Sequence, residues 1–147
     1  SGKDDIRFLF SANLGQKPAL LSKIASGGEL SRVMLALKAI MSRTKALPTI
    51  IFDEIDTGVS GATARKIADI LSEMGQDMQV ISISHLAQIA AKSDSHFKVW
   101  KDNAEGSTQT HIQEFGADQR LEEIARLLSG EEITAAALAN AKQLMAK

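Results

Sequence analysis

Two acidic side chains, Asp53 and Glu54, follow an apolar run in a pattern that suits phosphate chemistry. Residues 49–52 are apolar and β-branched, which is typical of a buried strand. A carboxylate at a rigid strand end can hold Mg²⁺ near the phosphates of ATP, directly or through water. A carboxylate beside it can activate the attacking water. We assign Asp53 to the metal and Glu54 to the base, with solvated strand-end acids or helix caps as the alternative.

The segment Ser26-Gly27-Gly28-Glu29 precedes an amphipathic helix and offers a phosphate site of a different kind. Two glycines leave the first N–H groups of the helix unshielded, and the helix dipole favours an anion there. Ser26 adds a hydroxyl donor at the N-cap position. The same residues also fit an ordinary capping box of the S-x-x-E type, which uses the same geometry. Both interpretations place a helix N-terminus here.

Asp56 and His85 are the remaining candidates. Asp56 opens a turn-forming segment, residues 56–61, which is also compatible with a plain turn and a helix cap. His85 follows the apolar strand expected at residues 80–84, where a buried, hydrogen-bonded histidine is the alternative. Because neighbouring parallel strands end at the same edge of a sheet, where ligands bind, we expect Asp53, Glu54 and His85 to lie side by side.

Apolar periodicity predicts the elements that position these side chains. Helices are expected from about residue 30 and over residues 67–74, 86–92, 121–128 and 133–145. Strands are expected over residues 6–10, 49–52 and 80–84, with a hairpin formed by residues 97–100 and 110–113 around a turn at 102–107, and a loop or irregular ribbon at 13–26. This alternation predicts an α/β fold, with a mostly parallel sheet flanked by helices, a β-hairpin and C-terminal helices.

The composition limits the other classes of function. A chain of 147 residues suits one domain, and a net charge of −1 argues against a strongly basic nucleic-acid-binding domain. The absence of cysteine excludes disulfides and cysteine-based zinc sites. No apolar run approaches the roughly 18 to 20 residues that a membrane helix needs, so we expect a cytoplasmic protein with no membrane partner.

The order of these motifs resembles the C-terminal lobe of ABC-type ATPases. Pro-Thr usually follows the Asp-Glu pair in transporters, whereas this chain has Ile55-Asp56. The details are similar to the RecN family of bacterial SMC-like ATPases. The similar segments are residues 23–32, 51–61, 120–130 and 138–142.

The resemblance implies a role for each candidate residue. Residues 26–29 are the signature motif, which contacts the γ-phosphate of ATP held by the opposite subunit. Asp53 supports Mg²⁺ and Glu54 is the catalytic base. Asp56 lies in the D-loop, which communicates across the dimer. His85 is the switch histidine, which hydrogen-bonds the γ-phosphate or the attacking water.

The sequence lacks the G-x-x-x-x-G-K-[ST] loop that cradles phosphates, and it has no sustained heptads. We therefore expect half of a head, inactive alone, with an apolar face or edge exposed where an N-terminal lobe docks. By the resemblance, ATP closes two heads as a homodimer and drives tethering or reorganisation of DNA in double-strand-break repair, at the nucleoid. The alternatives are a non-catalytic docking or dimerisation module and a head lobe of another SMC-like or transporter ATPase.

Overall fold

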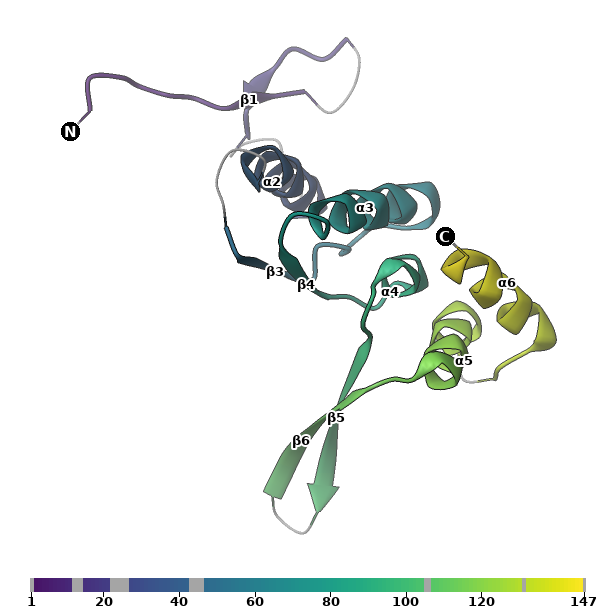
Figure 1. Ribbon diagram of the computed structural model, residues 1–147. Helices are drawn as coiled ribbons and strands as arrows, with labels where there is room; N and C mark the ends of the chain where they lie inside the picture. Colours follow the sequence, from purple (N-terminus) through teal and green to yellow (C-terminus); the bar gives the residue numbers. More distant parts are fainter. Residues whose placement is uncertain are drawn as a thin grey trace.

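The computed structural model describes residues 2–11, 15–21, 27–42, 47–104, 107–130 and 132–146. Its elements, labelled as in Figure 1, are β1 (Leu9–Phe10), β2 (Ala19–Leu20), α2 (Gly27–Ser42), β3 (Thr49–Asp53), α3 (Gly61–Met74), β4 (Gln79–Ile83), α4 (Ala87–Lys92), β5 (Phe97–Ala104), β6 (Ser107–Glu114), α5 (Ala117–Ser129) and α6 (Ala135–Met145). The strand expected at residues 6–10 is shorter, and its antiparallel partner β2 lies in the segment expected to be a loop or ribbon.

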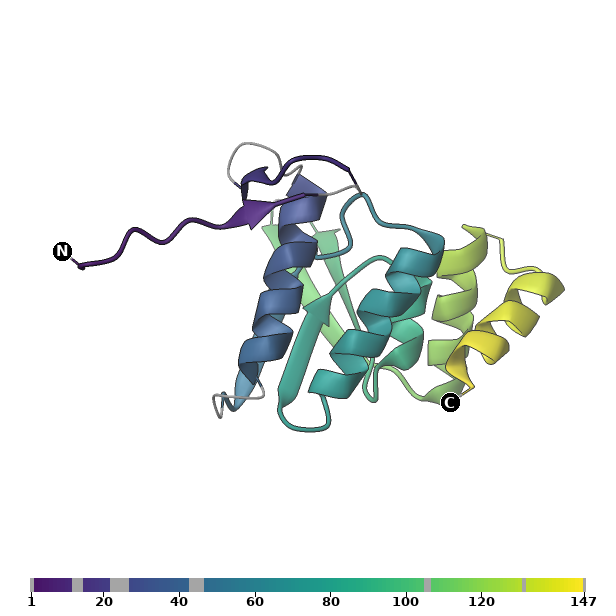
Figure 2. The same ribbon diagram turned by 90° about the horizontal axis from the view of Figure 1, so that it is seen from above.

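The unit that positions the candidate residues is β3–α3–β4. The two strands pair in parallel, from Thr49 opposite Gln79 to Asp53 opposite Ile83. Figures 1 and 2 show α2 and α3 side by side over one face of this pair. A core cluster fills the space between them, because Phe52 on β3 and Ile67 on α3 are almost fully buried. The parallel crossover expected from the strand–helix–strand pattern is therefore present.

The other face of the strand pair is open. Alternate residues of a strand point to opposite faces, and on this face Ile51, Ile81 and Ile83 are 59%, 43% and 55% exposed. The expectation that these strands are buried on both faces is wrong for this chain, because no described element covers this side. In Figure 1 this open face is directed downward, away from α2 and α3.

Helix α2 also exposes much of its apolar face. Its buried hydrophobic residue is Leu35, whereas Leu30, Met34 and Ile40 are 42%, 43% and 65% exposed. A shallow groove of about 240 Å³ runs between this helix and β3, with Met34 and Ile51 among its lining residues. The periodicity correctly predicted the helix, but much of its apolar stripe is left without a partner.

Helices α4, α5 and α6 form the remaining core. Their contact is lined by small residues, so the helices approach closely: Ala125 and Ala141 are fully buried beside Ile124. Thr134 is the N-cap residue of α6, and its hydroxyl oxygen accepts a hydrogen bond from the N–H of Ala137 at 3.1 Å. The alanine-rich helix predicted at residues 133–145 is confirmed with its start moved by two residues.

Arg120 on α5 ties this helix to the end of α4. Its guanidinium donates to the carbonyl oxygens of Ala90 at 3.2 Å and Ala91 at 3.0 Å, and also to that of Ser93. These carbonyls lie in the last turn of α4 and just after it, where a helix leaves carbonyl groups short of intrahelical partners. The guanidinium therefore acts as a helix cap supplied from another element.

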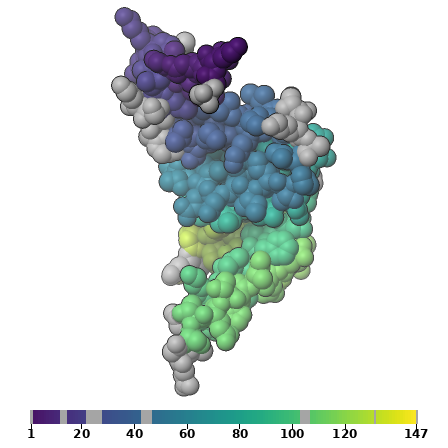
Figure 3. Space-filling model, turned by 90° about the vertical axis from the view of Figure 1, so that its left-hand side faces the viewer, coloured from purple at the N-terminus to yellow at the C-terminus, as the bar shows by residue number. Residues whose placement is uncertain are grey.

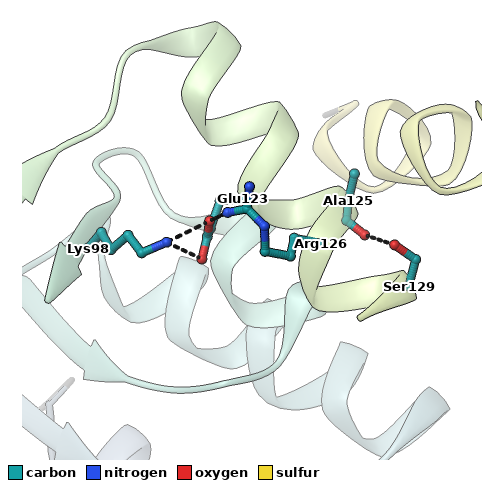
Figure 4. A network of polar contacts seen from close by, with 5 residues as sticks. All are labelled: Lys98, Glu123, Ala125, Arg126 and Ser129. Atoms are coloured by element: carbon teal, nitrogen blue, oxygen red, sulfur yellow. Dashed lines mark hydrogen bonds and ion pairs between the residues drawn. The ribbon is translucent and has the colours of Figure 1, made fainter. Parts of the chain in front are cut away.

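The hairpin β5–β6 projects away from the helices (Figures 1 and 3). Its pairing runs from Phe97 opposite Glu114 to Ala104 opposite Ser107, so it is longer than predicted and residues 102–104 are strand rather than turn. The amino group of Lys98 contacts both carboxylate oxygens of Glu123 on α5, at 3.2 and 3.1 Å, and Arg126 contacts the same carboxylate (Figure 4). This network attaches the base of the hairpin to α5.

Candidate functional site

Asp53 and Glu54 lie at the carboxyl end of β3, and both are exposed. The N–H of Glu54 continues the strand pairing by donating to the carbonyl of Ile83 at 3.2 Å. The backbone then turns sharply, because Glu54 has a φ of 48°, the one positive φ among the described non-glycine residues. Thr57 holds the turn by donating its N–H and its hydroxyl to the carbonyl of Glu54, at 3.3 and 3.0 Å.

The turn at Glu54 is energetically unfavourable for a residue with a side chain. The left-handed conformation costs about 1–2 kcal/mol per non-glycine residue. Such strain persists where the surrounding structure over-determines the backbone, and it concentrates at functional sites. The strained position is also the one that the sequence predicts as the base.

Asp56 lies inside the molecule, with an exposed fraction of 0%. Its Oδ2 accepts hydrogen bonds from the hydroxyl of Ser84 at 2.5 Å and from the backbone N–H of His85 at 3.2 Å. Its Oδ1 is also buried and has no partner among the described residues. The helix that follows has Ser60 at its N-cap position, without a side-chain capping bond. Asp56 is therefore not a helix cap, and its carboxylate joins β3 to the end of β4.

The ring of His85 lies at the surface above this carboxylate. Its side chain is 71% exposed, and its Nδ1 is 3.4 Å from Oδ2 of Asp56. The alternative of a buried histidine is therefore wrong. Asp53, Glu54 and His85 stand at the ends of neighbouring strands as expected, since β3 and β4 pair in parallel, whereas the contact between Asp56 and His85 was not predicted.

Gly27, Gly28 and Glu29 form the first turn of α2, where the sequence predicted a helix N-terminus. Ser26 lies outside the described residues, and so does its expected cap. A Cβ added at Gly28 would lie 2.9 Å from the carbonyl oxygen of Thr57. Glycine is thus required at position 28 because the backbone of α2 touches the loop after Glu54.

Sequence reasoning missed Ser84 and Thr57. Ser84 stood at the end of the expected strand, and its position next to His85 was the available signal. The contact between Thr57 and Gly28 had no local signal, because it joins segments far apart in the chain.

The described residues contain no cluster of three or more metal-ligating side chains. Asp53 and Glu54 do offer exposed carboxylate oxygens, which are the donors that Mg²⁺ prefers, and they suit a site where nucleotide and water supply further ligands. Within the same part of the chain, no helix combines the length and apolar character needed to cross a membrane.

Comparison with curated proteins finds relatives that are DNA repair proteins. The chain is 46% identical to the DNA repair protein RecN of Treponema pallidum over 144 residues, and 47% identical to that of Rickettsia typhi over 145 residues. These alignments cover 98% and 99% of this chain but 25% and 26% of the relatives, so the chain spans about a quarter of their length. No family model matches. The resemblance to RecN inferred from the motifs is confirmed.

Solved structures give the fold. A chain described under "Structural biochemistry of ATP-driven dimerization and DNA stimulated activation of SMC ATPases" matches with a TM-score of 0.57 and 19% identity, over 80% of this chain and 70% of that one. The Smc head domain with a coiled coil and joint from Pyrococcus yayanosii matches with a TM-score of 0.61 and 22% identity, over 78% of this chain and 21% of that one. The predicted α/β lobe of an ATPase head is thereby confirmed as the fold.

Proposed function

Since this chain is similar over nearly all of its length to a C-terminal part of RecN, we propose that it is one lobe of an ATP-hydrolysing head. The observation that carries the proposal is the meeting of two strand ends. Glu54 follows β3, His85 follows β4, and the buried carboxylate of Asp56 links the two. This edge of a parallel sheet is where α/β proteins bind ligands.

Each acid at the end of β3 has a distinct task in this proposal. Asp53 holds Mg²⁺, directly or through water, and the bound ion neutralises charge on the phosphates. Glu54 is the general base that orients and activates the attacking water. Its left-handed backbone is the local feature that distinguishes its position from that of Asp53. His85, exposed after the end of the neighbouring strand β4, hydrogen-bonds the γ-phosphate or the water.

The N-terminus of α2 serves a second nucleotide, on the opposite subunit. Gly27, Gly28 and Glu29 begin the helix, with Ser26 before them, so N–H groups and the positive end of the helix dipole can meet a γ-phosphate. The complete ATP site then needs two heads, and ATP closes them as a homodimer.

The open face of β3 and β4 is the docking surface for an N-terminal lobe that carries the P-loop. Ile51, Ile81 and Ile83 are exposed there, and the groove against α2 continues the apolar surface. Exposed apolar patches of this kind mark interaction sites. The 147-residue chain alone is then inactive, because its sequence lacks the P-loop motif that cradles the phosphates.

The role of the whole protein follows from its relatives. We propose that the ATP cycle of the closed and open heads tethers or reorganises DNA ends during double-strand-break repair, at the nucleoid in the cytoplasm. The relatives are DNA repair proteins by name, and the chain covers about a quarter of them. We therefore expect DNA to bind the complete protein.

The test is reconstitution of this chain with its N-terminal lobe, followed by measurement of ATP turnover. Glu54→Gln is expected to keep ATP binding and to lower turnover by about 10²–10⁴-fold, the usual contribution of a general base. Glu122→Gln, an exposed glutamate on α5, is the matched control and should leave turnover unchanged. Equal turnover in Glu54→Gln and wild type would show that the base is misassigned. Turnover by the chain alone would refute the half-head proposal.

A non-catalytic docking module is the second candidate, and the exposed apolar face favours it. On this view the chain binds its partner lobe without any role in ATP turnover. Nucleotide binding by the reconstituted head that is lost in Ser26→Arg would count against it. A head lobe of another SMC-like or transporter ATPase is a third candidate, which co-purification with a membrane subunit would support.

A further inference from the structure

The carboxylate of Asp56 is buried, and its contacts converge on one of its two oxygens. Burying a charged or polar group is unfavourable unless hydrogen bonds replace water. The side chain is fully buried, and three donors approach one oxygen, Oδ2, while Oδ1 has no partner among the described residues. All three donors belong to Ser84 and His85. The carboxylate is therefore directed at the segment between β4 and α4.

Ser84 relays this interaction along the backbone. Its hydroxyl donates to Oδ2 of Asp56 at 2.5 Å and accepts from the N–H of Leu86 at 3.0 Å. Leu86 is the N-cap residue of α4 and offers no side-chain cap. The backbone on both sides of His85 is thus tied to one buried carboxylate.

The imidazole of His85 completes the arrangement. Its Nδ1 lies 3.4 Å from Oδ2 of Asp56, while its side chain is 71% exposed. An ionised carboxylate only accepts hydrogen bonds, so the contact is favourable when Nδ1 carries a proton. In a neutral imidazole the other nitrogen, Nε2, then has the free lone pair. The distance is long for a hydrogen bond, as is common at catalytic contacts before substrate is bound.

We propose that Asp56 is a positioning residue for the ATPase reaction: it holds His85 as the Nδ1–H tautomer and presents Nε2 to the nucleotide. This inference rests on the function proposed above. Nδ1 keeps its proton throughout, so His85 exchanges hydrogen bonds with nucleotide or water at Nε2 alone. Neutral Nε2 accepts a hydrogen bond from the attacking water, and protonated Nε2 donates one to a phosphate oxygen. Asp56, in the expected D-loop, thereby orients a histidine of its own chain, in addition to any contact that it makes across the dimer.

The direct test is the ¹⁵N spectrum of the imidazole rings in the labelled 147-residue chain. The His85 signals are assigned by their loss in His85→Asn. The expected result is an Nδ1–H tautomer in the wild-type chain at a pH where His85 is neutral. An Nε2–H tautomer in the wild-type chain would overturn the proposal without recourse to any other variant.

Two variants separate positioning from folding. Asp56→Asn is nearly isosteric and can still accept from Ser84, but it removes the charge beside Nδ1, so His85 should become a mixture of tautomers. Ser84→Ala removes a bond to the carboxylate and leaves Asp56 beside the ring, so the tautomer should persist. A tautomer unchanged in Asp56→Asn would also refute the proposal.

Turnover by the reconstituted head distinguishes this inference from the proposed function. Asp56→Asn is expected to lower kcat by about 10–100-fold, by analogy with the loss found when the partner that orients a metal-binding histidine is removed, with little change in KM. If the wild-type head is active and Asp56→Asn leaves kcat unchanged, the positioning role of Asp56 is refuted and the ATPase function stands. A head that binds no ATP, with the expected tautomer in the isolated chain, would refute the ATPase assignment while the geometry at His85 stands.

Discussion

Replacing Ile51, Ile81 and Ile83 with threonine tests whether the open face of the sheet receives an N-terminal lobe. Threonine keeps the β-branched shape that suits a strand, and it removes most of the apolar surface. The three side chains are 59%, 43% and 55% exposed, which together is the equivalent of roughly one and a half isoleucine side chains left to cover. They point away from the core, so the fold of the chain should survive the change.

The expected loss of affinity follows from that exposed area. Full burial of an isoleucine side chain is worth about 1.5–3 kcal/mol, so covering this face contributes about 2–4.5 kcal/mol, of which the variant should lose about 2–4 kcal/mol because each threonine keeps one methyl group. Each 1.4 kcal/mol is about tenfold in the dissociation constant, so the triple variant should bind the lobe about 30- to 1000-fold more weakly. A buried hydroxyl without a partner would add to this loss.

Titration calorimetry with the separately produced N-terminal lobe measures the effect. Leu127→Gln is the control, because Leu127 is 37% exposed and belongs to α5, a helix that lies away from β3 and β4 in Figure 1, so its replacement should leave the affinity unchanged. Circular dichroism and the urea midpoint establish that the triple variant is folded. If the folded triple variant binds the lobe as tightly as wild type, this face is not the docking surface and the reasoning fails.

Three further changes test contacts inside the chain. Gly28→Ala should lower the free energy of unfolding by about 1–3 kcal/mol in urea titrations, because its Cβ would lie 2.9 Å from the carbonyl oxygen of Thr57. Gly75→Ala is the control: its Cβ would have no contact under 3.4 Å, so it should change the free energy of unfolding by about 0.5 kcal/mol or less. Burial, and then the charge of Arg120, lowers the pKa of His96 from 6.5. The imidazole is therefore protonated more readily in the unfolded chain than in the folded one. The stability that the neutral imidazole contributes is present above pH 6.5 and is lost as the pH falls through the pKa of the folded state. His96→Gln should flatten that part of the urea midpoint plotted against pH, and an unchanged slope would contradict the assignment. Arg120→Lys should destabilise the chain by about 1.5–3 kcal/mol, because an ammonium cannot reproduce the fork that caps α4, and faster amide exchange confined to the segment after α4 is the expected signature.

Local pattern was sufficient to predict the elements around the site. The apolar runs before Asp53 and His85 predicted two strands, and the strand–helix–strand order predicted that they pair in parallel. Those two facts bring the acids and His85 to one edge of the sheet. The same reasoning predicted α2 from about residue 30, whereas the helix begins at Gly27. The periods of strand and helix are properties of short segments, so they can be read from the sequence.

The hairpin and the strand faces were predicted less well. Residues 102–104 contain turn-forming side chains, yet the pairing of β5 with β6 continues through them. Ile51 and Ile81 belong to runs that indicate burial on both faces, yet in this chain they are exposed. Pairing with a distant strand overrode turn propensity in the first case. In the second, the apolar pattern records a surface that needs covering but does not say what covers it.

By itself, the sequence determined which residues stand at the strand ends and at the helix N-terminus, because these positions depend on local periodicity and on the rule for parallel crossovers. The tertiary structure alone decided where the side chains of those loops point. Asp56 turns inward onto Ser84 and His85, and Gly28 meets Thr57, because segments distant in the chain come into contact there. Such contacts depend on backbone angles, like the positive φ of Glu54, that no periodic pattern encodes.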